Sequence, residues 1–239
     1  MKVMTFGEIM LRLKTPEYLR ILQSDAFEAS YGGAESNVAV SLAMFGDEAA
    51  YLTKIPDNPV GMAALGEVRR FGVDTSQVLH GGSRLGIYYF EKGTDLRPTN
   101  VVYDREYSAL AMADAGEFAW GEILEGIDIF YFSGVTPAIS TSVEQAVLEA
   151  LQYCHDHGIQ VVCDLNYRSK MWSTEKAQEV MKNLMNYVVL LTTKISSRRL
   201  ESMLLTEIWP TASIRSTVTG KGWKRFCAGI RTARRWRVF

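Results

Sequence analysis

The sequence alternates short apolar segments with longer helical segments, and this rhythm constrains the fold more than any other feature. Continuous apolar runs at 127–132 and 159–163 indicate buried strands, and residues 142–157 between them repeat apolar side chains at helical spacing. Strands that alternate with helices predict an α/β domain with a parallel sheet covered on both faces. The same pattern predicts strands at 2–7 and 49–55 and helices at 35–45, 59–71 and 174–187.

Two segments do not follow this alternation. Residues 85–91 and 100–103 are rich in β-branched and aromatic side chains, and the polar residues 92–98 between them are typical of a hairpin turn. We therefore expect a small separate sheet that serves as a lid.

The composition is that of an ordinary soluble globular protein with a core of its own. The 239 residues are 47% hydrophobic and 22% charged. No apolar run reaches the roughly 18 residues that a membrane helix needs, and the N-terminal segment does not have the features of a signal peptide. We therefore expect a cytoplasmic protein without a membrane partner.

The cysteines and histidines do not indicate a metal site. Cys154, Cys163 and Cys227 form no CxxC pair, and thiols in a reducing compartment are mostly buried or incidental. His155 and His157 are two residues apart near the end of a predicted helix, so their side chains do not share a face. The sequence therefore predicts no metal ligands among them.

The charge of the chain changes sign at about residue 189. Residues 1–188 carry 15 Lys and Arg against 25 Asp and Glu, whereas residues 189–239 carry 11 against 2. The second segment also has no sustained apolar period of two or 3.6 and contains three of the five tryptophans. A basic segment of this kind ordinarily indicates a nucleic-acid-binding tail.

A pair of glycines opens the helix predicted at 35–45. In Tyr31-Gly32-Gly33-Ala34-Glu35-Ser36-Asn37 the glycines would let a ligand approach the backbone, and the helix N-terminus would supply free N–H donors. The alternative is a plain turn before a helix, because glycine commonly ends and begins secondary structure.

Two arginines lie beside aromatic residues near predicted strand ends. They occur in Tyr103-Asp104-Arg105 and in Asp164-Leu165-Asn166-Tyr167-Arg168. An arginine binds a carboxylate through a planar pair of N–H groups, so two arginines at one pocket would suit an acidic sugar. The alternative is two surface arginines without a ligand.

Three landmarks together resemble the N-terminal part of the ribokinase, or PfkB, family of carbohydrate kinases. They are Gly7-Glu8 after the first strand, Gly32-Gly33-x-x-x-Asn37, and Asp164-x-Asn166-x-Arg168 after a buried strand. A finer resemblance, to the 2-keto-3-deoxygluconate kinases, rests on five segments in the same order, at 5–13, 31–35, 84–89, 102–105 and 163–168. The resemblance covers residues 1–188.

The resemblance implies a ribokinase-like three-layer α/β/α sandwich with a β-sheet lid, whose strands lie at about 11–31 and 84–105. It also implies an ATP-dependent kinase of 2-keto-3-deoxygluconate or a related sugar acid, which uses Mg²⁺ and often forms a homodimer through the lid. By position, Arg105 and Arg168 would hold the sugar-acid carboxylate, and Asn166 is a candidate for cofactor binding. The residues that would bind the substrate are Gly33, Asn37, Tyr89, Tyr103, Arg105 and Arg168.

The resemblance ends before the residues that carry out phosphoryl transfer. The family's Gly-x-Gly-Asp motif, whose aspartate deprotonates the sugar hydroxyl, does not occur in this chain. The elements that bind adenine and the ATP phosphates, and the Asn-Glu element expected near 190–196, are missing too. We therefore expect a catalytically inactive chain, truncated part-way through its central sheet, with an apolar strand left at the edge.

A shift of reading frame would account for the charge change and for the missing Asn-Glu element. When Thr192 to Ser196 is read from the third base of each codon, the genetic code permits Asn-Glu-Asp followed by Phe, Leu or Ile. The hypothesis is that a frameshift near Val188 made residues 189–239 an out-of-frame tail, which we expect to be poorly ordered. Other residues are permitted at each step, so coincidence stays open.

Other functions are compatible with the sequence. The chain could be a working kinase with an unusual C-terminus, a non-enzymatic sugar-acid binding protein, or a nucleic-acid binder that uses its basic tail. Nucleic acid is the disfavoured partner, because the arginines after residue 189 form no helical stripe and no known motif. Among sugar acids the choice stays open, since a ketogluconate or a keto-deoxygalactonate carries a similar carboxylate.

Overall fold

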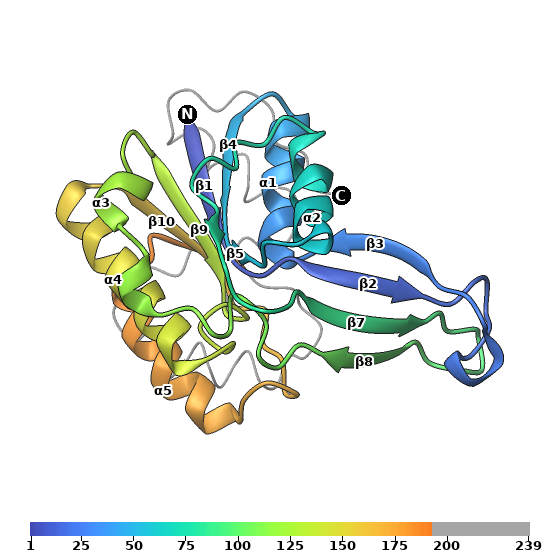
Figure 1. Cartoon of the computed structure of the whole chain (residues 1–239). Coiled ribbons are helices and arrows are strands. Elements are labelled where there is room, and N and C mark those ends of the chain that lie inside the picture. Colours follow the sequence, from blue (N-terminus) through green and yellow to red (C-terminus); the bar gives the residue numbers. More distant parts are fainter. Residues whose placement is uncertain (193–239) are drawn as a thin grey trace.

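The computed structural model describes residues 1–192, which form a central sheet covered by helices and a smaller sheet that projects from one end (Figure 1). All strand pairs of the central sheet are parallel, in the order β11-β10-β9-β1-β4. The parallel sheet expected from the alternating pattern is therefore confirmed. The bounds are β1 Lys2–Phe6, β4 Glu48–Leu52, β9 Ile129–Ser133, β10 Gln160–Asp164 and β11 Leu190–Thr192.

Helices cover both faces of this sheet, so the domain has the expected three layers (Figure 1). On one face lie α1 and α2, and Leu42 of α1 packs there with Val3 and Tyr131 of the strands. On the other face lie α3, α4 and α5. The bounds are α1 Ala34–Met44, α2 Pro59–Arg69, α3 Trp120–Ile123, α4 Thr141–His157 and α5 Thr174–Leu184.

The helix α4 shows how local sequence sets the limits of an element. Its N-cap Ser140 accepts a hydrogen bond from the backbone N–H of Val143 at 3.3 Å. Its C-cap Gly158 adopts a left-handed conformation, with φ 72°, which glycine enters without the cost of a Cβ. Its buried stripe consists of Val143, Ala146, Val147, Ala150, Leu151 and Cys154.

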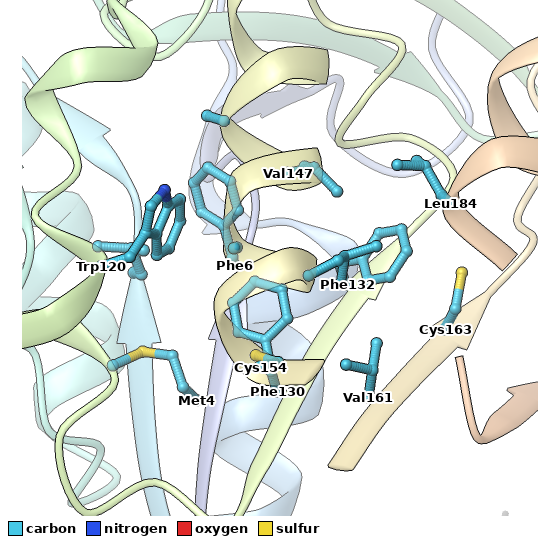
Figure 2. Packing of buried hydrophobic residues seen from close by; sticks show 14 of the residues in the cluster. Met4, Phe6, Trp120, Phe130, Phe132, Val147, Cys154, Val161, Cys163 and Leu184 are labelled. Atoms are coloured by element: carbon cyan, nitrogen blue, oxygen red, sulfur yellow. The ribbon is translucent and has the colours of Figure 1, made fainter. Parts of the chain in front are cut away.

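The main hydrophobic core lies between the sheet and the α4 face. Figure 2 shows Phe6, Phe130 and Phe132 of the strands beside Val147 of α4. All four side chains are fully buried. Cys154 and Cys163 are buried in the same core, which confirms the expectation of buried cysteines, while Cys227 lies outside the described residues.

The lid sheet is confirmed and has four strands in the order β3-β2-β7-β8. The strands β7 and β8 form the expected antiparallel hairpin, and the turn between them carries mutual backbone hydrogen bonds between Thr94 and Arg97. The lid extends away from the core (Figure 1), and most residues of its strands are half-buried or exposed. The bounds are β2 Met10–Lys14, β3 Glu28–Gly32, β7 Gly86–Glu91 and β8 Asn100–Asp104.

The structure corrects several expected boundaries. The strand expected at 49–55 is divided at Thr53, because β4 pairs with β1 whereas β5, Lys54–Ile55, leaves the central sheet and pairs with β6, Leu79–His80. The helix expected at 174–187 is α-helical to Leu184 and continues as a 3-10 turn, Met185–Tyr187. Two short 3-10 turns, Ile21–Gln23 and Ala115–Glu117, were not predicted from the sequence.

The central sheet continues beyond the boundary expected at residue 188. The strand β11 pairs with β10 in parallel register, with Leu190 opposite Val162 and Thr192 opposite Asp164. The expected disorder of the rest of the tail lies outside the described residues. Within residues 1–192 no helix is long and apolar enough to cross a membrane.

Candidate functional site

Loops from the core and from the lid meet at the carboxyl edge of the central sheet, where ligands bind in open parallel α/β sheets. Glu8 follows β1, Gly33 is the N-cap of α1, Arg105 follows β8, and Asn166 follows β10. The parallel register aligns the ends of these core strands, with Asp164 opposite Ser133 and Phe6 opposite Phe132. Segments far apart in the sequence therefore share one edge.

Arg105 lies at the junction between lid and core. Its Nη2 donates a hydrogen bond to Oε2 of Glu8, and its Nη1 lies 3.3 Å from Sδ of Met171. The side chain of Glu8 is 4% exposed and that of Arg105 is 15% exposed, so this ion pair is largely withdrawn from water. Arg105 is therefore held from both sides, by the loop after β1 and by the loop after β10.

Gly33 is required here for space and not for its backbone angles. Its φ of −162° is open to any residue, but a Cβ at this position would lie 2.0 Å from the backbone oxygen of Glu8. The backbone N–H of Asn37 donates to the Gly33 oxygen at 3.0 Å and so begins the hydrogen bonding of α1. Gly33 therefore lets the start of α1 lie against the Glu8 segment.

The loop after β10 places Asn166 and Arg168. Asn166 has φ 34°, and its backbone N–H donates to Oδ1 of Asp164 at 3.1 Å. The loop lies tight against Gly134, because a Cβ there would be 2.2 Å from the Leu165 oxygen. Arg168 is exposed, as is Asn37 on α1, so both are accessible to a ligand at the edge of the sheet.

The two tyrosines expected to bind one substrate lie on opposite faces of the lid. Tyr103 is directly opposite Tyr88 in the β7–β8 register, and their rings are 6.0 Å apart. Tyr89 is opposite Val102, and its ring packs against Phe27 at 5.8 Å. Since side chains alternate along a strand, Tyr103 and Tyr89 face away from each other. The expected set is therefore not gathered on a single face.

Tyr103 faces the loop after β10. The Nζ of Lys170 lies 5.9 Å from the centre of the Tyr103 ring and donates to the backbone oxygen of Val101 at 3.1 Å. Together with the contact between Arg105 and Met171, these interactions join β8 to that loop. The structure therefore brings Tyr103 and Arg105 to the same side of the junction.

A second carboxyl group, Glu35, is buried beneath the junction. Glu35 lies in the first turn of α1, is 1% exposed, and has Thr136 Oγ1 at 3.1 Å from its Oε1. Burial raises the pKa of Glu35 above its ordinary value of 4.5, against the opposing effects of hydrogen bonds from Ser133 and Thr136 and of the charge on Arg105. The side chain fills the space left by Gly7, where a Cβ would be 2.2 Å from Oε2.

The hydrogen bonds around Thr136 suit a neutral Glu35. The Thr136 hydroxyl lies 3.1 Å from the Phe6 backbone oxygen and 3.1 Å from Glu35 Oε1. A hydroxyl has one hydrogen to donate. If it donates to Phe6, the carboxyl of Glu35 must donate to it, which requires a protonated acid. This network ties α1 to the end of β1.

Sequence reasoning named Glu8 and Glu35 in motifs but assigned neither a place in the site. Glu8 directly follows a predicted buried strand, where a carboxylate is seldom buried without a partner. Glu35 lies in the first turn of a helix, where a carboxylate is ordinarily favourable and exposed, so its position did not signal burial. Their burial depends on the approach of the glycine segments, which the local pattern does not reveal.

The described residues do not bring a set of metal ligands together. Within residues 1–192 no group of three or more His, Cys, Asp and Glu side chains is placed to hold a metal ion. Asn166 offers a side-chain amide at the end of β10, and its role in cofactor binding stays a prediction. No step of a reaction can therefore be assigned to ATP or Mg²⁺ from these residues.

Comparison with known sequences places the chain among sugar kinases. The pfkB family carbohydrate kinase model matches residues 1–198. The chain is 42% identical over 183 residues to the 2-dehydro-3-deoxygalactonokinase of Haloferax volcanii, a match that covers 77% of this chain and 57% of that protein. A 5-dehydro-2-deoxygluconokinase of Bacillus subtilis is 27% identical over 187 residues, 76% of this chain and 56% of that protein. The chain thus spans little more than half the length of these relatives.

Comparison with solved structures gives the same fold. The 2-dehydro-3-deoxygluconokinase of Thermotoga maritima superposes with a TM-score of 0.81 and 43% identity, covering 87% of this chain and 68% of that one. A Pyrococcus horikoshii sugar kinase solved in complex with ATP gives a TM-score of 0.71 at 21% identity, covering 79% and 62%. The ribokinase-like fold is thereby confirmed, and the chain belongs to the PfkB family of carbohydrate kinases.

Proposed function

We propose that residues 1–192 are the sugar-acid-binding part of an ATP-dependent 2-keto-3-deoxygluconate or 2-keto-3-deoxygalactonate kinase, and that this chain binds a sugar acid without phosphorylating it. The observation that carries the proposal is the Arg105 guanidinium, held at the base of the lid by Glu8. A fixed arginine recognises the flat carboxylate that distinguishes sugar acids from neutral sugars. The Haloferax and Thermotoga relatives are named as kinases of keto-deoxy sugar acids, which supports a sugar acid as the ligand of this chain.

The absence of turnover follows from the chemistry of phosphoryl transfer. That reaction needs a base at the attacking hydroxyl and groups that stabilise the transferred phosphate. No Gly-x-Gly-Asp occurs in residues 1–239. We therefore propose that residues 1–239 bind the sugar acid alone, without the ATP and Mg²⁺ that the family resemblance implies.

Calorimetry with 2-keto-3-deoxygluconate and 2-keto-3-deoxygalactonate tests binding, and ADP release in the presence of ATP and Mg²⁺ tests turnover. Arg105→Met should weaken binding by about tenfold or more, because a hydrogen bond to a charged group contributes roughly 1.5–3 kcal/mol. Arg70→Met, at an exposed arginine paired with Glu67 on α2, is the matched control. The absence of heat with both acids would contradict the proposal that the chain binds a sugar acid. Sugar-dependent ADP release would contradict the proposal that the chain does not phosphorylate it.

The reading-frame hypothesis is part of this proposal. The pairing of β11 with β10 through Thr192 supports an intact frame through Leu191, slightly beyond the position near Val188 suggested by the charge change. The shifted codons that permit Asn-Glu begin at Thr192. Resequencing the gene from codon 180 to well past the stop decides the matter, since one added or missing base should restore Asn-Glu and a downstream Gly-x-Gly-Asp.

The lid is also the proposed dimer contact of a cytoplasmic protein. Several of its apolar side chains are exposed, among them Val102 at 46%, and the sheet projects from the core (Figure 1). Exposed apolar surface of this kind is typical of contacts between chains. Light scattering after size-exclusion chromatography should give twice the mass of one chain, and the mass of a single chain would contradict the dimer.

A further inference from the structure

Glu8 is a buried carboxylate at the point where the chain leaves the core for the lid. It lies between the end of β1 at Phe6 and the start of β2 at Met10, so its backbone belongs to the connection between the two sheets (Figure 1). The residue is 5% exposed. A carboxylate is rarely buried to this extent unless it is paired, so its partners indicate what it does.

Two glycines provide the space around Glu8. A Cβ at Gly86, the first residue of β7, would lie 2.9 Å from Glu8 Oε1 and 3.3 Å from the Arg105 Cβ. A Cβ at Gly33 would lie 2.0 Å from the Glu8 backbone oxygen. Glu8 is thus enclosed by the β7–β8 hairpin on one side and by the start of α1 on the other.

Each carboxylate oxygen of Glu8 has its own partner, and both partners follow β8. Oε2 accepts from Nη2 of Arg105, and Oε1 accepts from the Ser108 hydroxyl at 2.5 Å. Hydrogen bonds to both oxygens fix the plane of the carboxylate, and the carboxylate in turn fixes the guanidinium. Glu8 therefore determines where Arg105 lies relative to the core.

Arg105 keeps donors for a second acceptor. A guanidinium has five N–H groups, and here one Nη2 hydrogen serves Glu8 while Nη1 contacts the Met171 thioether, which is a weak acceptor. If a ligand displaced Glu8, a buried carboxylate would be left with Ser108 alone, which is unfavourable. An incoming carboxylate is therefore expected to share Arg105 with Glu8 and not to replace it.

We infer that Glu8 is a positioning residue, which holds the Arg105 guanidinium at the base of the lid so that its remaining N–H groups bind the carboxylate of a sugar acid. The inference rests on the proposed function, because it takes the ligand to be a sugar acid. It adds that selectivity for the acid depends on a residue that does not itself contact the ligand.

The test compares 2-keto-3-deoxygluconate with its uncharged methyl ester by calorimetry. The unaltered chain should prefer the acid, and Glu8→Ala should weaken acid binding by about tenfold while leaving the ester unchanged, because only the acid uses the oriented Arg105. Glu8→Gln should restore acid binding to within about threefold, since its amide oxygen still accepts from Arg105. If Glu8→Ala does not fold, Glu8→Asp, which withdraws the carboxylate by one methylene, should show the same loss.

A purely structural role for Glu8 predicts a different outcome. It would weaken the acid and the ester equally, and an unchanged ratio between them in Glu8→Ala overturns the inference while leaving the proposed function in place. Glu28→Gln is the matched control, because Glu28 pairs with Lys14 at 2.7 Å on the exposed part of the lid. This variant should keep the ratio of the unaltered chain.

A ligand-independent measurement separates this inference from the proposed function. Nitrogen-15 spectra of the arginine side chains should show hindered rotation for Arg105, assigned by its loss in Arg105→Lys, and this hindrance should disappear in Glu8→Ala. If the unaltered chain binds neither ligand, the proposed function fails, and hindered rotation still supports the positioning of Arg105 by Glu8. Freely averaged Arg105 signals in the unaltered chain overturn the inference.

Discussion

The buried Glu35 makes the stability of this domain depend on pH in a direction that can be measured. Burial raises the pKa of Glu35 in the folded state above the ordinary value of 4.5. The folded protein then holds a proton that the unfolded chain releases, so stability decreases as the pH rises above about 4.5 and levels off above the folded-state pKa. Replacement by glutamine, which has a similar shape and no charge, should abolish this dependence.

The magnitude follows from proton linkage. While the folded protein stays protonated at Glu35 and the unfolded chain does not, each pH unit costs about 1.4 kcal/mol. Between pH 5 and pH 7 the stability of Glu35→Gln relative to the unaltered protein should therefore increase by up to roughly 2.7 kcal/mol. Glu35→Ala should be less stable than Glu35→Gln throughout, because it leaves a cavity and removes one of the two hydrogen-bond contacts of the Thr136 hydroxyl.

Urea unfolding followed by circular dichroism at pH 5, 6 and 7 measures these differences. The reasoning is refuted if Glu35→Gln loses stability relative to the unaltered protein as the pH rises. That result would mean that Glu35 is ionised in the folded state and is stabilised by the nearby charge of Arg105, the one opposing charge identified for it.

Three further changes test the packing and one ion pair. Gly33→Ala should lower the thermal midpoint and sugar-acid binding together, because its Cβ would lie 2.0 Å from the Glu8 oxygen, and an unchanged midpoint in a melting curve would contradict this contact. Leu151→Ala in the fully buried stripe of α4 should cost about 2–5 kcal/mol in urea unfolding, and a loss below about 1 kcal/mol would contradict its place in the core. Lys54→Met should cost less than about 1 kcal/mol at pH 7, since Glu117 is partly exposed. The Lys54 hydrogen bond lowers the pKa of Glu117, so this difference should vanish as the pH falls through that pKa, and a difference that persists in acid would argue against the pair.

Local sequence determines the helices and the hairpin of this protein. The helix α4 has an apolar stripe at helical spacing and a glycine stop at Gly158, and both signals act within one or two turns of the chain. The hairpin at β7 and β8 is indicated in the same way by two strand-forming segments around a polar turn. The lid position of residues 11–31 came instead from the resemblance to a family, because that segment has no strong pattern of its own.

Contacts between distant segments decide the rest. The division of the strand expected at 49–55 depends on where β1 ends, since β5 has no partner in the central sheet and pairs with β6 instead. The opposite placement of Tyr89 and Tyr103 follows from the register of β7 and β8, in which a difference of one residue exchanges the two faces. A family motif names both tyrosines but does not state which face each one occupies.

The functional site shows most clearly which features follow from local sequence and which follow from contacts between distant segments. The sequence by itself identifies Arg105 as a group suited to an acidic ligand, because the chemistry of a guanidinium belongs to the residue. Only the tertiary structure brings Glu8 to Arg105 across 97 residues and buries Glu35 against Thr136 across 101 residues. The physical reason is that burial and pairing of a charge depend on which loops meet at the edge of the sheet, and no local pattern along the chain records that meeting.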